Sequence, residues 1–269
     1  MITNTGKLQQ LRVLAGKTSR FADYFVFGAT TGVPGAPDLT EESKTLKVGW
    51  GVCPITGSYV DEKDNQIIFY ATVPNTLAGL IGEIGLLSLD SEYIKQDKPA
   101  TGAYFFEAGE NWSFETDIEY VDGETGQVRL GSRSVLFDST EPQRATLSDA
   151  IDTTMFDQLV IVGDTSAPIT ISLYSGENDY AVKTDIALNP LSEVTLNLND
   201  MEVHGEYDPA KVAAVVFDLP PGNHIIDGIL FRDTKYGNLV AGSEVAEPFY
   251  KSAGSNLEIE YAVKLNGTD

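Results

Sequence analysis

The sequence predicts a mainly β protein of two domains, one of which is a β-sandwich of the jelly-roll kind. Short runs of alternating apolar and polar residues recur at fairly even spacing from residue 104 to residue 232, each bounded by Gly, Pro, Asn or Asp. Before this stretch, residues 90–102 contain Asp97-Lys98-Pro99 and Thr101-Gly102, which is typical of a linker. Helical spacing of apolar residues is confined to one short segment at the N-terminus.

That segment begins at Thr3 or Asn4, either of which can cap a helix, and ends at Gly16. Within it Leu8, Leu11 and Leu14 recur at a spacing of three and line one face. We therefore expect one short helix before the first strand.

The remaining elements of the outer domain follow in order. A strand over residues 24–28 precedes a Gly- and Pro-rich loop, residues 29–37. An amphipathic stretch around residues 46–50, a strand over 66–73 ended by Pro74, and a glycine-punctuated apolar run over 77–87 come next. The sandwich is expected to supply strands at residues 159–162, 169–174, 180–185, 194–198, 212–217 and 225–231.

Length and charge limit the classes of function. The 269 residues are enough for one large or two ordinary domains. With 40 acidic and 18 basic residues, the formal charge of −22 argues against nucleic acid, because phosphate binding depends on clusters of Lys and Arg. The acidity indicates either a solvated surface that favours solubility or a role in cation binding or steering.

Two further observations concern the compartment. Cys53 is the single cysteine, so an intramolecular disulfide is not expected, and a small buried residue is the expected role. The first residues lack the apolar core of a signal peptide, and no apolar run reaches the roughly 20 residues that a membrane span needs. We expect synthesis in the cytoplasm and no membrane partner.

Short motifs within residues 104–232 carry a resemblance. They are Tyr104-Phe105-Phe106-Glu107, Asn111-Trp112, the turn over residues 128–135, and Ile226-Asp227-Gly228-Ile229. Together they resemble galactose-binding-like jelly rolls, of which carbohydrate-binding modules are the best known. The resemblance implies a possible host-surface polysaccharide as partner, although fold alone does not settle function.

Motifs on both sides of that stretch carry a second resemblance. They are residues 2–7 (ITNTGK), 25–28 (FVFG), 71–74 (ATVP) and 82–86 (GEIGL), followed after the sandwich by 238–241 (NLVA) and 257–261 (LEIEY). Their order resembles the N-terminal domain of bacteriophage tail-fibre and tail-collar proteins, including minor tail proteins. The resemblance implies a virion structural protein located in the tail.

We accordingly expect a split phage-tail-type domain, residues 1–103 and 233–269, with the jelly roll inserted as residues 104–232. A sandwich whose first and last strands lie close together can replace a surface loop of another domain without disturbing its core. Fibres of this family usually continue into long shafts, but this sequence has no repeat, heptad or collagen-like period. The resemblance therefore favours a compact adaptor at the collar, baseplate or fibre.

Glu107 and Asp227 are the candidate metal ligands. In galactose-binding-like modules a structural calcium often lies where the first and last strands meet, and these two carboxylates occupy the matching positions. Calcium takes six to eight oxygen ligands, so carbonyls or other side chains would have to complete the site. The alternative is that both are solvated carboxylates at strand ends.

Tyr174 is the candidate carbohydrate-facing residue. Trp50, Trp112, Tyr174 and Tyr180 could form a face on which sugars stack, or could belong to the core. Trp112 is expected to pack inward, whereas Tyr174, next to the turn at residues 175–179, is the better candidate for exposure.

No catalytic constellation is recognisable in the sequence. The carboxylates between Glu107 and Glu124 match the clustering expected by chance, and a glycosidase pair needs a defined separation in a cleft. His204 and His224 have no metal-ligand spacing and are expected in surface or capping roles. A nucleophile elbow and a phosphate-binding loop are both missing.

The expected function is a non-enzymatic structural component of a phage tail, present as a homo-oligomer that binds other tail proteins. The split domain would dock, and the jelly roll would attach further parts or adhere to host glycans, with repetition adding strength. The alternative is a stand-alone carbohydrate-binding protein. Exposed apolar surface on the split domain would favour docking, and exposed aromatic residues on the jelly roll would favour glycan binding.

Overall fold

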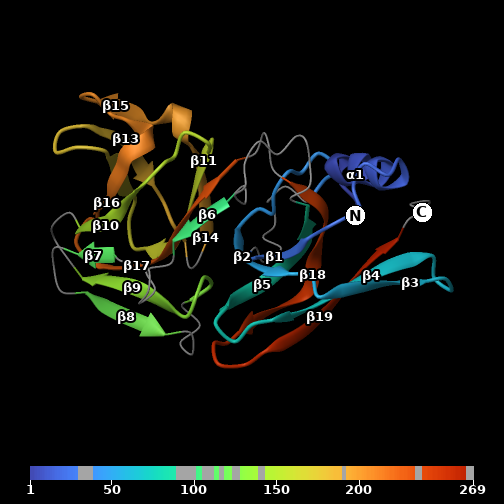
Figure 1. Cartoon of the computed structure of the whole chain (residues 1–269). Coiled ribbons are helices and arrows are strands. Elements are labelled where there is room, and N and C mark those ends of the chain that lie inside the picture. The colour runs from blue at the N-terminus through green and yellow to red at the C-terminus, as the bar shows by residue number, and fades with distance from the viewer. Residues whose placement is uncertain are drawn as a thin grey trace. The chain divides into compact units, whose positions relative to one another are not determined.

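The computed structural model describes residues 1–29, 39–88, 101–104, 112–114, 118–122, 128–138, 143–189, 192–233 and 238–264. Within these residues the chain is mainly β with one short α-helix near the N-terminus, which confirms the predicted fold class (Figure 1). None of the described helices has the length and apolar character needed to cross a membrane.

The chain forms two compact units. Unit 1 combines Met1–Ala100 with Thr234–Asp269, and unit 2 is Thr101–Asp233, so that unit 2 lies in sequence between the two segments of unit 1. The divisions expected from the sequence, after residues 103 and 232, lie close to these.

Unit 1 contains the helix and two small antiparallel sheets. The elements are α1 (Asn4–Leu14), β1 (Tyr24–Gly28), β2 (Gly49–Pro54), β3 (Gly57–Asp61), β4 (Gln66–Val73), β5 (Gly79–Leu87), β18 (Leu239–Lys251) and β19 (Leu257–Lys264). One sheet has the order β18-β5-β1-β2 and the other β19-β4-β3. Since β18 and β19 come from the second segment, each sheet joins strands from both segments of unit 1.

The helix begins as expected but turns a different face to the protein. Thr3 is the N-cap, and its hydroxyl accepts a hydrogen bond from the Gly6 amide and donates one to the Leu239 carbonyl. Gly6 lies so close to β18 that a Cβ there would come within 2.0 Å of the Val240 carbonyl oxygen. Because this contact requires a small residue, the leucine face points elsewhere, and Leu11 and Leu14 are 62% and 84% exposed.

Large aromatic and aliphatic side chains fill the interior of unit 1, among them Phe25, Phe27, Leu46, Ile81 and Leu86. The indole of Trp50 donates a hydrogen bond of 2.8 Å to the Leu80 carbonyl, which satisfies its polar atom. Cys53 is buried on β2 as expected, and burial raises the pKa of its thiol to about 11. At that pKa the thiol stays protonated near neutral pH and is a poor nucleophile.

Unit 2 is a sandwich of two antiparallel sheets. Its strands are β6 (Thr101–Tyr104), β7 (Trp112–Phe114), β8 (Glu119–Asp122), β9 (Arg133–Asp138), β10 (Gln143–Ile151), β11 (Gln158–Thr165), β12 (Ile169–Tyr174), β13 (Tyr180–Ile186), β14 (Ser192–Asn197), β15 (Glu202–His204), β16 (Val212–Asp218) and β17 (Asn223–Arg232). Two 3-10 turns, η2 (Leu198–Asp200) and η3 (Pro209–Lys211), lie between strands. The sheet orders are β15-β13-β12-β16-β10-β7 and β14-β11-β17-β9-β8, with β6 also paired to β17.

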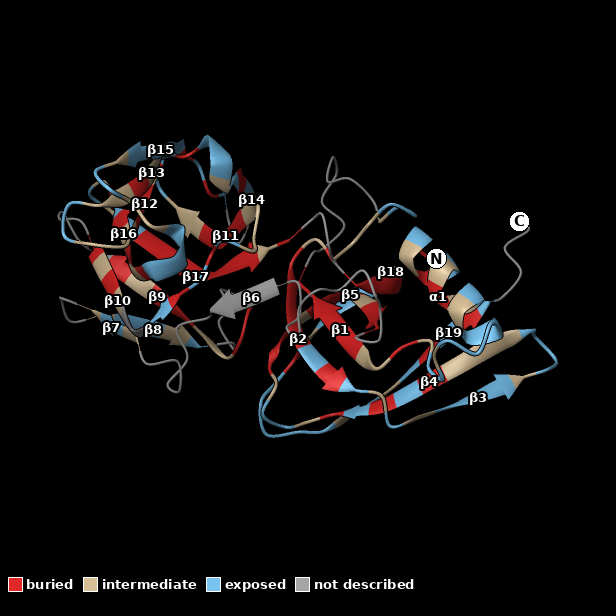
Figure 2. Cartoon of the chain, turned by 45° about the horizontal axis from the view of Figure 1, so that its top comes forward, coloured by how far each residue is buried: buried red, intermediate tan, exposed pale blue. Residues whose placement is uncertain are grey.

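The core of unit 2 lies between its two sheets. Alternate residues of both sheets enter one cluster, including Leu173 and Phe217 from one sheet and Ile161 and Phe231 from the other. Strand β17 is buried along nearly all of its length (Figure 2). Trp112 is half-buried and packs against this cluster, as expected.

The first and last strands of unit 2 are hydrogen-bonded neighbours. Strand β6 runs antiparallel to the end of β17, with Thr101 opposite Arg232 and Tyr104 opposite Ile229. The chain therefore enters and leaves unit 2 at the same end of one strand pair, which is the geometry that an inserted domain needs.

Candidate functional site

The outer face of the six-stranded sheet of unit 2 carries the tyrosine that the sequence singled out. On β12 the side chains of Ile171 and Leu173 point into the core, so Tyr174 points to the opposite, solvent side. Tyr174 lies directly across from Tyr180 on β13, which in turn lies across from His204 on β15.

These rings stack into a continuous row. The ring centroids of Tyr174 and Tyr180 are 4.8 Å apart and nearly parallel, and those of Tyr180 and His204 are 4.6 Å apart. The guanidinium carbon of Arg144, on β10, lies 4.6 Å from the centroid of the Tyr174 ring. We refer to Arg144, Tyr174, Tyr180 and His204 as the tyrosine row.

Stacking determines which parts of the row a ligand can reach. Tyr180, from β13, and Arg144, from beyond β16, approach the Tyr174 ring from the two sides of β12, so both faces of this ring are covered. Tyr174 and Tyr180 nevertheless remain partly exposed, and the side chain of His204 is 40% exposed. The row thus offers ring edges and polar atoms to solvent, whereas a sugar stacked flat on Tyr174 would first have to displace Arg144.

Small side chains lie beside the row on the same outer face. Tyr174 pairs across the sheet with Ala214, and the next position along β12, Ser172, pairs with Val182 and Val216. Ala214 and Ser172 are buried, and Val182 and Val216 are half-buried. The large rings of the tyrosine row therefore lie next to a shallow surface formed by smaller side chains.

The turn that joins β12 to β13 is held by hydrogen bonds at the end of the row. The amide of Ser175 donates to the Asp179 carbonyl at 2.9 Å, and the Ser175 hydroxyl accepts from the Asp208 amide at 2.9 Å. The Asp179 carboxylate accepts from the Glu206 amide at 2.8 Å, beside Gly205 in the left-handed region. These bonds fix the hairpin, so the rings are ordered before any ligand arrives.

Asp227, the candidate calcium ligand, is fully buried rather than solvated at a strand end. One carboxylate oxygen accepts hydrogen bonds from the amides of Arg129 and Leu130, at 2.9 and 2.8 Å, and the other accepts one from the Ser134 hydroxyl at 2.6 Å. Burial raises the pKa of Asp227 to about 7, and these hydrogen bonds oppose the rise. Asp227 thus ties the turn over residues 128–135 to β17.

The calcium site itself stays a prediction. Glu107 lies outside the described residues. Among those that are described, no three or more His, Cys, Asp or Glu side chains come together as a metal site. A site at Asp227 would have to use lone pairs that its three hydrogen bonds leave unused.

The two histidines have different environments. His204 is half-exposed in the tyrosine row, and its Nε2 lies 3.4 Å from a carboxylate oxygen of Glu202. The expectation of a surface or capping role is wrong for His224, which is fully buried on β17 with its Nε2 2.7 Å from the Pro220 carbonyl. Because a carbonyl oxygen can only accept, Nε2 is the donor in this hydrogen bond.

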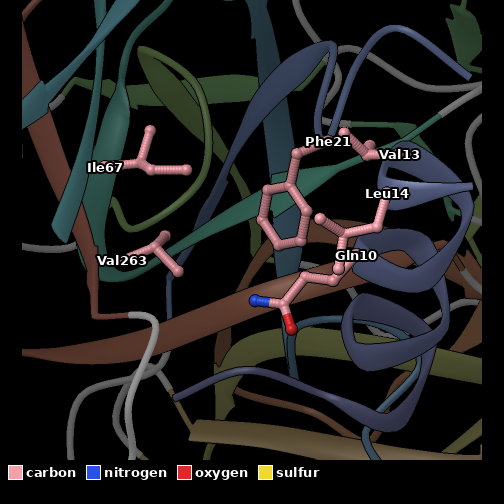
Figure 3. Close-up of a pocket in the computed structure, with 6 residues that line it drawn as sticks. All are labelled: Gln10, Val13, Leu14, Phe21, Ile67 and Val263. Atoms are coloured by element: carbon pink, nitrogen blue, oxygen red, sulfur yellow. The ribbon is translucent and has the colours of Figure 1, made fainter. Parts of the chain in front are cut away.

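Unit 1 carries a cavity of about 290 Å³ between the helix and the three-stranded sheet (Figure 3). It is lined by Gln10, Val13, Leu14, Phe21, Ile67 and Val263. Phe21 also stacks on Phe69 of β4, with ring centroids 5.9 Å apart. Of the three leucines whose spacing indicated an apolar helix face, Leu14 lines this cavity, whereas Leu8 and Leu11 are not part of its lining.

A buried glutamate forms a second polar site in unit 1. Glu83, on β5, is fully buried; one carboxylate oxygen accepts a hydrogen bond from the Lys47 amide at 3.0 Å, and the other makes no hydrogen bond. The Lys47 ammonium lies 3.9 Å from Glu83 and 2.8 Å from Glu244. Burial raises the pKa of Glu83 to about 7, although Lys47 acts in the opposite direction.

Comparison with known proteins gives matches among solved structures only. No protein-family model matches the chain, and no curated protein matches it. The solved structures include a family 11 carbohydrate-binding module of a cellulosomal cellulase of Clostridium thermocellum, with 12% identity, a TM-score of 0.34, and coverage of 52% of this chain and 91% of the module.

Two other solved structures match with similarly low identity and TM-score. The xylan-binding module CBM86 from Roseburia intestinalis is 15% identical with a TM-score of 0.33, covering 49% of this chain and 94% of that one. The module CsCBM6-3 from Clostridium stercorarium, in complex with cellobiose, is 12% identical with a TM-score of 0.33, covering 52% and 99%.

Proposed function

We propose that this protein binds carbohydrate, without catalysis, on the outer face of the six-stranded sheet of unit 2. The observation that carries the proposal is the tyrosine row, in which Tyr174, Tyr180 and His204 stack in order while remaining partly exposed. Aromatic side chains that stay partly exposed on the solvent side of a sheet bury less apolar surface than they would in a core. Their exposed edges and polar atoms therefore favour a role in binding a ligand.

The chemistry of this face matches that of a sugar. A pyranose has apolar C–H faces and a rim of hydroxyl groups, and tyrosine combines an apolar ring with a hydroxyl that both donates and accepts. The half-buried side chains of Val182 and Val216 can contact the C–H face of the sugar. The phenols of the row and the guanidinium of Arg144 can then bond to the hydroxyls.

The test compares variants of Tyr180, at the centre of the row. Binding of the intact protein to a panel of soluble polysaccharides, mixed-linkage β-glucan and xylan among them, is measured by affinity electrophoresis and by calorimetry. Tyr180→Phe should weaken binding by about 3- to 10-fold through loss of one hydrogen bond, and Tyr180→Ala should weaken it further. The control is Tyr120→Phe, the same chemical change at a more exposed tyrosine on β8 of the other sheet.

The expected result is that binding falls for the Tyr180 variants and stays unchanged for the control, while circular dichroism shows all proteins folded. Absence of binding to the whole panel by wild-type protein would refute the proposal. Equal loss in the Tyr180 and Tyr120 variants would place the binding site elsewhere.

A second candidate is the structural role in a virion tail, in which unit 1 docks onto neighbouring tail proteins and unit 2 projects as the adhesive part. Exposed apolar side chains on unit 1 support docking: Leu11, Leu14, Tyr59, Val60 and Tyr70 are each more than a third exposed. If the role is correct, an antibody against the protein should label tail structures on purified particles. If mass spectrometry did not detect the protein in purified particles, this role would be excluded.

A further inference from the structure

Unit 1 carries an apolar socket on one side of its three-stranded sheet. The socket is the cavity of Figure 3, where Val13 and Leu14 of the helix and Phe21 face Ile67 of β4 and Val263 of β19. Leu14 is 84% exposed at its rim, and the neighbouring Val60 of β3, which pairs with Ile67, is 65% exposed. An apolar surface of this kind, left open to water, indicates a binding site.

The chemistry and size of the socket favour a tyrosine side chain. Its walls are apolar except for the side-chain amide of Gln10. At about 290 Å³ it lies at the lower end of the range for small-molecule sites, which suits a single anchoring side chain. Tyrosine has an apolar ring and one polar hydroxyl, and it is among the residues most often found as an interface anchor.

The opposite side of the same sheet presents such tyrosines. Because side chains alternate along a strand, Ile67 faces the socket whereas Tyr70 faces away, and Tyr59 lies beside Tyr70 with ring centroids 6.4 Å apart. Tyr59 is 47% exposed and Tyr70 is 38% exposed. Strand β3, which carries Tyr59, is drawn largely in the colour of exposed residues in Figure 2.

Tyr70 lies flat over the β3 backbone, since a Cβ added to Gly57 would come within 2.3 Å of its hydroxyl oxygen. Tyr59 is the more exposed of the two. The two tyrosines therefore differ in role: Tyr70 supports the surface, and Tyr59 can enter a partner.

Charge distinguishes the two sides of the sheet. The first 22 residues, which include the helix, contain Lys7, Arg12, Lys17 and Arg20 and no acidic residue, although the whole chain has a formal charge of −22. Around the tyrosines, Glu258 and Glu260 of β19 point outward with Tyr70, and Asp61 points outward with Tyr59; Lys264 lies at the far end of the same face. Lys7 is paired with Glu41, and Arg20 with Asp23, so the helix side keeps an excess of positive charge after these pairs are counted. The tyrosine side has three carboxylates against one lysine, and the two sides are therefore complementary in charge.

We propose that unit 1 binds a second copy of this chain head to tail, with Tyr59 of one copy seated in the socket of the next. The proposal names the partner for the docking role described above and rests on that role, and it is independent of carbohydrate binding. The socket and the tyrosine face lie on opposite sides of one sheet. A contact between two copies uses the socket of one and the tyrosine face of the other. The tyrosine face of the first copy and the socket of the second are then left for further copies. Such a heterologous contact continues from copy to copy, into a ring or a filament.

Sedimentation velocity on the full chain tests the contact. Wild-type protein should show average mass rising with concentration beyond a dimer. Leu14→Glu places a like charge beside the partner's acidic face, and Tyr59→Lys removes the anchor; both positions are exposed, so both variants should fold. Each variant alone should associate at least about tenfold more weakly. The control is Val203→Glu, an exposed apolar residue of unit 2 that is 59% exposed, which should behave as wild type.

Mixing the two variants separates head-to-tail from symmetric association. The Leu14→Glu copy keeps an intact tyrosine face and the Tyr59→Lys copy keeps an intact socket, so the mixture should form one-to-one heterodimers and stop there. A wild-type protein that stays monomeric at high concentration, or a mixture that recovers nothing, would overturn the proposal. Val13→Glu, which also lies in the socket lining and is 36% exposed, serves as a second socket variant if Leu14→Glu misfolds. Glycan binding by both variants should remain intact, so failure of this inference is distinguishable from failure of carbohydrate binding.

Discussion

Glu83→Gln should change how the stability of unit 1 depends on pH. Burial raises the pKa of Glu83 from its ordinary value of 4.5 to about 7, so the folded state favours the protonated acid. The unfolded chain ionises near pH 4.5, and the free energy of unfolding therefore falls as pH rises from there through 7. This difference in pKa corresponds to about 3 kcal/mol, since each tenfold change in proton affinity is worth about 1.4 kcal/mol.

The glutamine variant cannot ionise, so its stability relative to wild type should increase with pH. We expect the difference in the free energy of unfolding, variant minus wild type, to grow by about 2 to 3 kcal/mol between pH 5 and pH 9. Urea unfolding followed by the fluorescence of Trp50, which is buried in unit 1, measures this difference. A Trp112→Phe background removes the signal of unit 2.

The matched control is Glu62→Gln, the same chemical change at an exposed position of unit 1. Only the buried position should produce a growing difference. A difference that is constant with pH, or that shrinks as pH rises, would show that Glu83 is ionised in the folded protein and stabilised by Lys47, and would refute the reasoning.

Three other changes have defined outcomes. Gly6→Ala should lower the free energy of unfolding of unit 1 by about 1 to 3 kcal/mol, because the added methyl group meets the Val240 carbonyl; urea unfolding measures it. Lys251→Met should cost about 2 to 4 kcal/mol, since the buried ammonium donates to three backbone carbonyls that the thioether cannot satisfy; a lowered melting temperature is the readout. If Glu107 and Asp227 hold calcium, chelation should lower the melting temperature of calcium-supplemented protein, and an unchanged value argues against the site.

Local patterns were sufficient to predict six of the twelve described strands of unit 2. The alternation over residues 169–174 matches β12, because every second side chain there enters the core. Strand β10 was missed because its sequence, QRATLSDAI, contains few large apolar residues; of its described side chains, Ala145 and Ile151 enter that core. A strand of this composition gives no clear periodic apolar signal.

The candidate sites depend on pairings that are distant in the sequence. Tyr174 and Tyr180 flank one turn, so their proximity was visible from sequence, but His204 joins them only through the register of β13 with β15. The sequence indicated Asp227 as a candidate calcium ligand. It did not indicate the backbone amides that donate hydrogen bonds to Asp227, because these lie about a hundred positions earlier. Glu83 had a signal that was not used: it is an acidic residue within the apolar run over residues 77–87.

The pairing of β6 with β17 affects how unit 2 can be lost from the protein. An appended domain hangs on one connection, and a single proteolytic cut there sets it free. Unit 2 has two, one before Thr101 and one after Asp233. After a cut at either connection, unit 2 remains attached through the other, and β6 remains hydrogen-bonded to β17. Release requires two cuts, so a unit inserted in this way tolerates a protease-rich environment better than one added at a chain end.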